Sequence, residues 1–198
     1  ELEYTKAFTF YKIGLCYKAA KKNMEALRAF QKSLREDPQF YLSMMEQSDL
    51  YLEMGSMKEA LHFAKEAVAL NENNLEFQKK LAFLYIDSGR FEESLSCLKK
   101  LVDVEPKRFY NWYAYSEVIM LIGEYEDAIT VLEQATKIHQ RAELYYQLSN
   151  SYLHLNDKEN GQKALQKALE LDESLSSDMQ EKYPFIKEQI SKEKSKNK

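Results

Sequence analysis

The stretch "SDLYLEMGSMKEA", residues 48–60, has the form of two helical segments joined by a glycine turn. The stretch "AFLYIDSGRFEES", residues 82–94, repeats this form, with Tyr85 in the place of Tyr51 and Gly89 in the place of Gly55. Glycine at such a place suits a left-handed helix terminus. The two stretches therefore predict a unit made of a helix, a tight turn and a second helix.

The same spacing runs through the rest of the chain. Tyr17, Tyr51 and Tyr85 follow one another at equal intervals, and the series continues at Ile119 and then, after an interval shorter by one position, at Tyr152. Nine positions after each of these stands a small residue: Ala26, Ala60, Ser94, Ala128 and Gly161. Small residues at a fixed spacing indicate close contact between helices. The sequence therefore predicts five helix pairs, as a period of this length does in repeat proteins.

The repeat resembles the tetratricopeptide repeat, whose pattern is W-x2-L-G-x2-Y, then A-x3-F, then P over about 34 residues. The first unit matches it at Phe10, Ile13, Gly14, Tyr17, Ala26, Phe30 and Pro38, and the fourth carries Trp112, Tyr115, Ser116, Ala128, Leu132 and Ala135. Gln47, at the seventh position of the second repeat, departs from the pattern. The resemblance implies an all-α fold, a right-handed α-α superhelix (solenoid) of five helix pairs with a C-terminal capping helix.

The register predicts the limits of the repeats. They are expected at 7–40, 41–74, 75–108, 109–141 and 142–175, within one domain that spans residues 1–175. After them the sequence changes to a segment interrupted by Pro184 and ending in alternating lysines. Because the last repeat of a solenoid needs a cap with one polar face, residues 176–198 are predicted to form a capping helix and a Lys-rich disordered tail.

Composition narrows the classes of function. The chain has 198 residues and a net charge of -4, so it offers no overall positive field to attract nucleic acid. No apolar run approaches the length of roughly 18 residues that a membrane span needs, and no signal-peptide pattern is present, which predicts a cytoplasmic protein without membrane insertion. The first residue is not Met, so we expect the chain to be part of a longer protein.

Catalytic and metal-binding signatures are missing from the sequence. It contains no GxGxxG, GK[ST], HExxH or GxSxG string. Two cysteines and three scattered histidines do not make a zinc site. We therefore expect no enzymatic activity, no metal and no cofactor, and we interpret Cys16 and Cys97 as small apolar residues that fill space between helices.

The only tryptophan, Trp112, lies among Tyr110, Tyr113 and Tyr115. Such a cluster could be a stacking platform for bases, a cage for a cation, or part of the core. Trp112 and Ile119 fall on one face of a helix, which is the face that packs inward in the resembled family. Tyr113 is rotated from Trp112 by about 100°. The sequence thus predicts a buried Trp112 and a surface Tyr113.

In the resembled family the first helix of each pair lines a concave wall with its positions 2, 5, 9, 12 and 13. These positions are rich in apolar side chains here, and six acidic residues among them face only Lys18 and Lys79. Exposed aromatic and Met side chains suit an adaptable binding surface. The predicted peptide-binding residues are Tyr11, Met45, Asp49, Lys79, Phe83, Tyr113, Glu117, Tyr146 and Asn150. Burial against a neighbouring first helix is the alternative for the four aromatic residues of this set and for Met45.

One known mode of binding can be excluded on the residues present. Chaperone-binding members of the family hold a C-terminal carboxylate with Lys, Asn and Arg at fixed positions. The first three repeats offer Tyr11, Leu15, Glu46, Lys79 and Phe83 at those positions, so that clamp is absent.

Two functions remain from the sequence. The first is a non-enzymatic scaffold for protein interactions that binds an apolar or basic peptide segment of a partner in the concave groove. The alternative is a regulatory or self-assembly segment, whose groove is filled by a missing N-terminal portion of the same protein or by a second copy. The expected partner is a protein or peptide, and the expected oligomeric state is a monomer or a weak homodimer.

Overall fold

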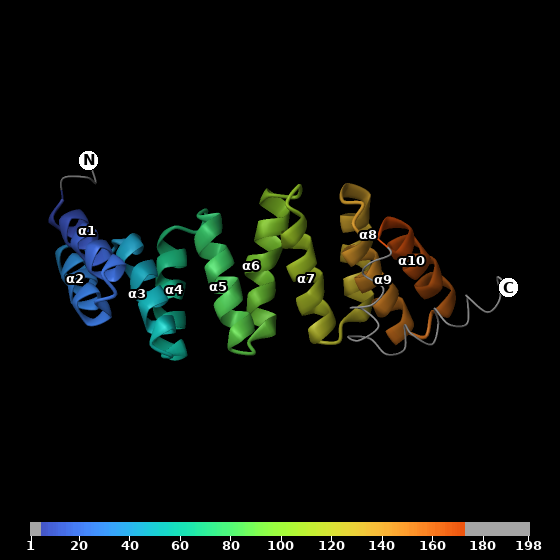
Figure 1. Cartoon of the computed structure of the whole chain (residues 1–198), viewed down its shortest axis with the longest axis horizontal. Helices are drawn as coiled ribbons and strands as arrows, with labels where there is room; N and C mark the ends of the chain where they lie inside the picture. Colours follow the sequence, from blue (N-terminus) through green and yellow to red (C-terminus); the bar gives the residue numbers. More distant parts are fainter. Residues whose placement is uncertain (1–4, 173–198) are drawn as a thin grey trace. The chain divides into compact units, whose positions relative to one another are not determined.

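The computed structural model describes residues 5–172, and within them it contains ten α-helices and no strand (Figure 1). The prediction of an all-α repeat fold is confirmed for this part of the chain. The predicted capping helix and Lys-rich tail at 176–198 lie outside the described residues. The helices are α1 (Lys6–Ala19), α2 (Asn23–Glu36), α3 (Tyr41–Glu53), α4 (Met57–Leu70), α5 (Leu75–Asp87), α6 (Phe91–Val104), α7 (Phe109–Leu121), α8 (Tyr125–Ile138), α9 (Ala142–His154) and α10 (Lys158–Leu171).

The chain divides into two compact units, which we call the N-terminal unit (Glu1–Val104) and the C-terminal unit (Glu105–Lys198). In the N-terminal unit α1 packs on α2, α3 on α4 and α5 on α6, and α3 and α5 also pack against the helix before them. In the C-terminal unit α7 packs on α8 and α9 on α10, while α9 also contacts α7 and α8. The limits predicted for the five repeats stay a prediction.

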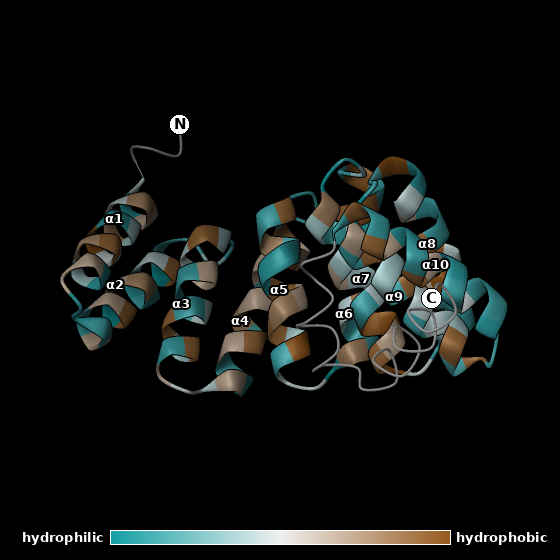
Figure 2. Ribbon diagram, turned by 45° about the vertical axis from the view of Figure 1, so that its right-hand side comes forward, coloured by the Kyte–Doolittle hydropathy of each residue, from teal (hydrophilic) through white to brown (hydrophobic). Residues whose placement is uncertain are grey.

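Each helix has one side toward its neighbours and another toward solvent. Figure 2 shows both hydrophilic and hydrophobic segments along most helices. The small residues that the sequence places early in the second helices are fully covered: Ala26, Ala60 and Ala128 have no exposed surface. Their small side chains let the two helices of a pair approach closely, so the prediction made from their spacing is confirmed.

Buried serine hydroxyls add hydrogen bonds between paired helices. Ser48 Oγ donates to the carbonyl oxygen of Ala60 at 2.8 Å, and Ser149 Oγ donates to that of Gly161 at the same distance. These serines occupy equivalent places in their pairs. Because a buried hydroxyl without a partner is costly, each bond fixes where one helix lies along the other.

The turn inside each pair has one residue in the left-handed region. Gly55, Gly89 and Gly123 have φ angles of 78°, 71° and 87°, which confirms the predicted turn. At the equivalent places of the first and fifth pairs stand Lys21 and Asn156, with φ angles of 57° and 60°. A side chain with a Cβ is strained there, and asparagine less than lysine.

Lys21→Gly is therefore expected to raise the free energy of unfolding of the N-terminal unit by about 1 kcal/mol, because it removes the left-handed strain. Asn156→Gly is the matched control and should give a smaller gain in the C-terminal unit. Urea denaturation followed by circular dichroism measures both changes. A loss of stability in Lys21→Gly would show that the lysine side chain contributes more than its backbone strain costs.

Candidate functional site

The N-terminal unit carries a network of ion pairs that joins its three first helices. Lys18 Nζ of α1 lies 2.7 Å from Glu46 Oε2 and 3.4 Å from Asp49 Oδ2, both on α3. Lys80 Nζ of α5 lies 2.7 Å from the same oxygen of Asp49. Burial alone would lower the pKa of Lys18, but its hydrogen bond to Glu46 and the attraction of both carboxylates raise it above the ordinary value. Lys18 is therefore held in its charged form.

This network corrects the predicted charge of the wall. From the repeat positions, Asp49 was predicted to be one of six acidic residues that faced only Lys18 and Lys79. In the structure Asp49 is paired with Lys18 and Lys80. The missed residues, Glu46 and Lys80, both stand at the sixth position of their repeats, with opposite charges one repeat apart. That spacing is the signal that would have found them.

Three of the predicted peptide-binding residues are buried: for Met45 and Tyr146 the alternative of burial holds, and for Asn150 the expected exposure is wrong. Met45 is 2% exposed, Tyr146 is 1% exposed and Asn150 is 5% exposed. Met45 lies on α3, which is covered by both α2 and α4. Tyr146 packs in a core cluster with Leu165 and Ala168 of α10, and burial raises the pKa of its hydroxyl. A first helix that is packed against more than one neighbouring helix exposes fewer residues to solvent than a helix that is packed on one face only.

Other predicted residues of the N-terminal unit remain accessible. Phe83 on α5 is 46% exposed, and Leu52 on α3, also a wall position, is 40% exposed. Tyr11 and Lys79 are half-buried. The ring of Tyr11 lies 5.6 Å from that of Phe40 between centroids, and burial raises the pKa of its hydroxyl. Tyr11 is thus part core and part surface.

The first helices also border a depression of about 660 Å³ in the N-terminal unit. Leu15, Lys18 and Ala19 of α1 line one side of it, and Glu46 and Glu53 of α3 line the other. It therefore combines an apolar side chain with members of the ion-pair network. We call the surface formed by Leu15, Lys18, Asp49, Leu52, Lys80 and Phe83 the first-helix face.

The aromatic cluster of the C-terminal unit divides between core and surface, although Tyr113 is less exposed than predicted. Trp112 is 6% exposed, and its Nε1 donates to the carbonyl oxygen of Pro106 at 2.7 Å. Tyr113 is half-buried, with its ring 5.9 Å from that of Phe109, and Glu117 is also half-buried. Tyr110 is 72% exposed. The interpretation of Trp112 as core is confirmed, and Tyr110 is the ring that the unit presents to solvent.

The two cysteines differ in environment. Both are free thiols; Cys97 is buried, and this burial raises its pKa, as expected for a space-filling residue. Cys16 is exposed on α1, so its interpretation as a filler is wrong. Within residues 5–172 we find no group of three or more His, Cys, Asp or Glu side chains that could hold a metal. In the same part of the chain no helix has both the length and the apolar character needed to cross a membrane.

Known structures show the same fold. YrrB, described as a TPR protein with an unusual peptide-binding site, superposes with a TM-score of 0.71 at 15% identity, over 84% of this chain and 87% of that chain. A crystal structure of the MamA protein gives a TM-score of 0.70 at 20% identity, over 89% of this chain and 94% of that chain. A comparison with curated proteins finds no significant match.

Family models agree with these likenesses. Three models described as tetratricopeptide repeat match residues 11–74, 51–114 and 142–175. Together with the helix pairs and their left-handed turns, these matches show that the chain belongs to the tetratricopeptide repeat family, whose members are scaffolds for protein–protein interaction.

Proposed function

We propose that the chain is a non-enzymatic, cytoplasmic scaffold that binds an apolar peptide segment of a partner protein on the first-helix face of its N-terminal unit. The observation that carries the proposal is the exposure of Leu52 and Phe83, two large apolar side chains, beside the paired charges of Lys18, Asp49 and Lys80. Apolar side chains gathered on one face of a soluble protein are typical of interaction sites.

The paired charges favour an apolar ligand over an ionic one. Asp49 accepts from two lysines at once, so a basic ligand would have to break an existing pair to reach it. Partly buried pairs of this kind hold their side chains in place and form a fixed polar border. Glu53 and Asp87 are exposed near the ends of α3 and α5, and they would favour basic residues flanking the apolar segment.

The C-terminal unit offers similar chemistry on its own first helix. Tyr110 and Leu121 are 72% and 58% exposed, and the half-buried Tyr113 and Glu117 lie between them on α7. We propose a second peptide contact at these residues. Its features, an exposed ring and a carboxylate, support the same preference for apolar segments with basic flanks. The structural neighbour YrrB is described as having a peptide-binding site, which supports a peptide as the ligand in this proposal.

Phe83→Ala is expected to weaken binding of the best peptide from a random library about tenfold, since an exposed aromatic anchor is typically worth over about 1 kcal/mol. Folding should change little, because the ring is 46% exposed. Leu70→Ala, at the end of α4 and 41% exposed, is the matched control and should bind as the parent does. Fluorescence anisotropy with labelled peptides measures the three affinities.

Equal affinities of parent and Phe83→Ala would contradict the first-helix face as the binding site. If no library peptide binds and the protein forms a concentration-dependent dimer by light scattering, the self-assembly alternative replaces the proposal.

A further inference from the structure

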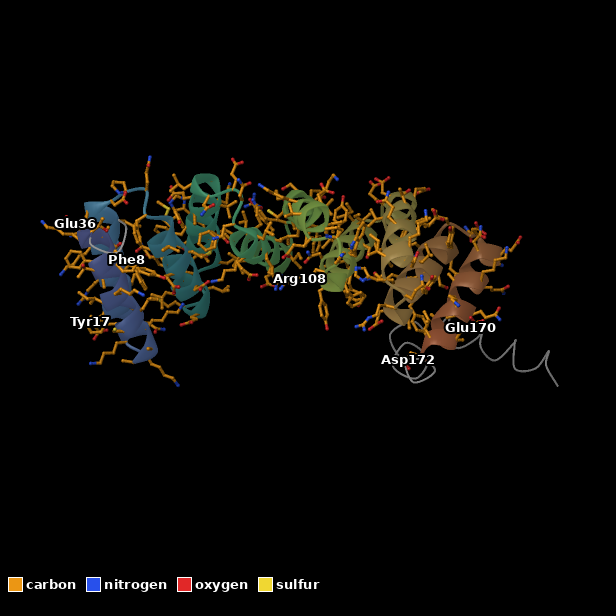
Figure 3. All side chains as sticks on the ribbon, turned by 90° about the horizontal axis from the view of Figure 1, so that it is seen from above. Phe8, Tyr17, Glu36, Arg108, Glu170 and Asp172 are labelled. Atoms are coloured by element: carbon orange, nitrogen blue, oxygen red, sulfur yellow. The ribbon has the colours of Figure 1, made fainter. Side chains whose placement is uncertain are left out.

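Helix α1 has a second exposed apolar surface, separate from the first-helix face. Figure 3 marks two of its residues, Phe8 and Tyr17, on α1. Ile13 is 39% exposed and Tyr17 is 38% exposed, and Cys16 between them is also exposed. This surface, which we call the outer face of α1, lines a depression of about 580 Å³. Its lining residues are Phe8, Thr9, Lys12, Ile13, Cys16, Tyr17, Ala20 and Lys22.

The same positions are buried in the next two first helices of the unit. The residues equivalent to Thr9, Ile13 and Cys16 in α3 are 0%, 1% and 0% exposed, and in α5 they are 8%, 4% and 4% exposed. These residues are Ser43, Gln47 and Leu50 in α3, and Phe77, Leu81 and Leu84 in α5. In both cases the second helix of the preceding pair packs against the first helix. The outer face of α1 therefore has the register of a surface that receives a helix.

The spacing of the exposed residues also indicates a helical ligand. Thr9, Ile13, Cys16 and Tyr17 follow one another at intervals of four, three and one residues, which places them in one row along α1. A groove of this kind accepts the apolar side of an amphipathic helix. An extended strand finds no unpaired backbone edge on a helix to pair with.

The charges around the outer face are mostly basic. Lys12 and Lys22 line the depression itself, and a neighbouring depression that shares Ile13 and Tyr17 is lined by Arg28, Lys32 and a single acidic residue, Glu25. Lys12 Nζ lies 5.1 Å above the ring of Phe8, so its charge is held beside the apolar surface. This basic surface stands out because the whole chain is acidic, with a net charge of -4. A partner with acidic flanks complements the basic surface.

We propose that the outer face of α1 is a docking site for an amphipathic α-helix with acidic flanks, supplied by a partner protein. The helix lies along α1 as α2 lies against α3 and as α4 lies against α5. Its apolar side covers Ile13, Cys16 and Tyr17, and its carboxylates pair with Lys12 and Lys22. The site is independent of the peptide contact on the first-helix face.

The probe is a set of three synthetic peptides built on residues 57–70, the sequence of α4, which already packs on a first helix in this way. The acidic peptide carries Lys58→Glu and Lys65→Glu, the basic peptide carries Glu59→Lys and Glu66→Lys, and the third is unchanged. These changes leave the buried apolar residues of α4 untouched, so the apolar seam is the same in the set. Circular dichroism of each peptide checks that helix content is matched.

The readout is alkylation of Cys16 in the whole protein, because Cys16 is exposed whereas Cys97 is buried away from the reagent. The acidic peptide should protect Cys16 and bind about tenfold more tightly than the unchanged one, as several weak ion pairs would give. The basic peptide should bind least. Lys12→Glu combined with Lys22→Glu should reverse this order, and the matched control, Lys107→Glu combined with Lys158→Glu, should preserve it.

Four results would overturn the proposal. Equal affinity of the three peptides would show that charge does not select the ligand. Binding without protection of Cys16 would show that the peptide binds elsewhere than on the outer face of α1. Protection of Cys16 by phosphatidylserine vesicles but not by the acidic peptide would assign the face to a membrane surface. Protection that grows with protein concentration in the absence of peptide would assign it to a second copy of the chain.

Discussion

Trp112→Ala is expected to lower the free energy of unfolding of the C-terminal unit by about 3–5 kcal/mol, the range for large-to-small changes at buried aromatic residues. Trp112 is only 6% exposed, so the substitution leaves a cavity in α7's contact surface. It also removes the donor that bonds the Pro106 carbonyl oxygen at 2.7 Å. That oxygen lies 3.0 Å from His139 Nε2 as well, so its loss of partners is only partial.

Urea denaturation of parent and variant, followed by far-ultraviolet circular dichroism, measures this change. In the parent, fluorescence of the single tryptophan reports on the C-terminal unit alone, which separates its transition from that of the N-terminal unit. Tyr110→Ala is the control: the ring is two residues away but 72% exposed, and its loss should cost under about 0.5 kcal/mol. A cost below about 1 kcal/mol for Trp112→Ala would mean that the indole contributes little to the core.

Gly14→Ala is expected to lower the free energy of unfolding of the N-terminal unit when residue 30 is Phe. When residue 30 is Leu, the same substitution should leave it unchanged or raise it. A Cβ on Gly14 would lie 2.6 Å from Cδ1 and 2.8 Å from Cζ of Phe30, a ring with no exposed surface. Overpacking a rigid core of this kind costs about 1–3 kcal/mol. Alanine gains about 1 kcal/mol over glycine in a helix interior, so we expect a net loss of up to about 2 kcal/mol.

The residues at the equivalent positions of the other repeats indicate which substitution would relieve the contact between a Cβ at position 14 and Phe30. Opposite the equivalent first-helix residue these repeats carry a smaller side chain than phenylalanine, and they tolerate a Cβ there. The equivalent pairs are Ser48 with Ala64, Ala82 with Leu98, Ser116 with Leu132, and Ser149 with Leu165. In the background of Phe30→Leu, Gly14→Ala should therefore become neutral or stabilising, because the overpacking cost is removed, and this corresponds to a coupling of about 1–3 kcal/mol.

A double-mutant cycle of the four proteins, measured by urea denaturation, gives the coupling directly. Additive effects of Gly14→Ala and Phe30→Leu would show that the Phe30 ring moves aside without cost. Gly55→Ala would not serve as a control because its φ is positive, so we use Ala19→Gly, an exposed position near the end of the same helix. That change should lower stability only by the difference in helix propensity.

The fold was largely predictable because residues with a local structural requirement recur at the period of the repeat. Gly55, Gly89 and Gly123 mark turns that only a left-handed residue can make, and the small residue nine positions after each Tyr17 equivalent marks the helix contact. The turns at Lys21 and Asn156 carry no glycine and are recognised only from the spacing. Gln47 shows the limit: it is 1% exposed, and its amide atoms have no partner among the described residues, which no local pattern indicates.

The candidate site was predictable only in part. Repeat positions identify which side of a first helix faces the wall, and Phe83 is exposed there. They do not show how far neighbouring helices cover it, and Met45 and Tyr146 are buried because α3 and α9 are packed on several sides. Ion pairing was also missed, since Lys80 rather than Lys79 reaches Asp49, a difference of one position and about 100° around the helix.

The serine bonds between paired helices have a mechanical consequence. Ser48 and Ser149 each tie a first helix to the backbone of its second helix, so sliding α3 along α4, or α9 along α10, must break a buried hydrogen bond. At the same place α5 has Ala82, which has no hydroxyl to donate. Shear along α5 and α6 is therefore resisted at this position by side-chain shape alone. Under tension we therefore expect the pairs α3–α4 and α9–α10 to resist slip at this position better than the pair α5–α6 does.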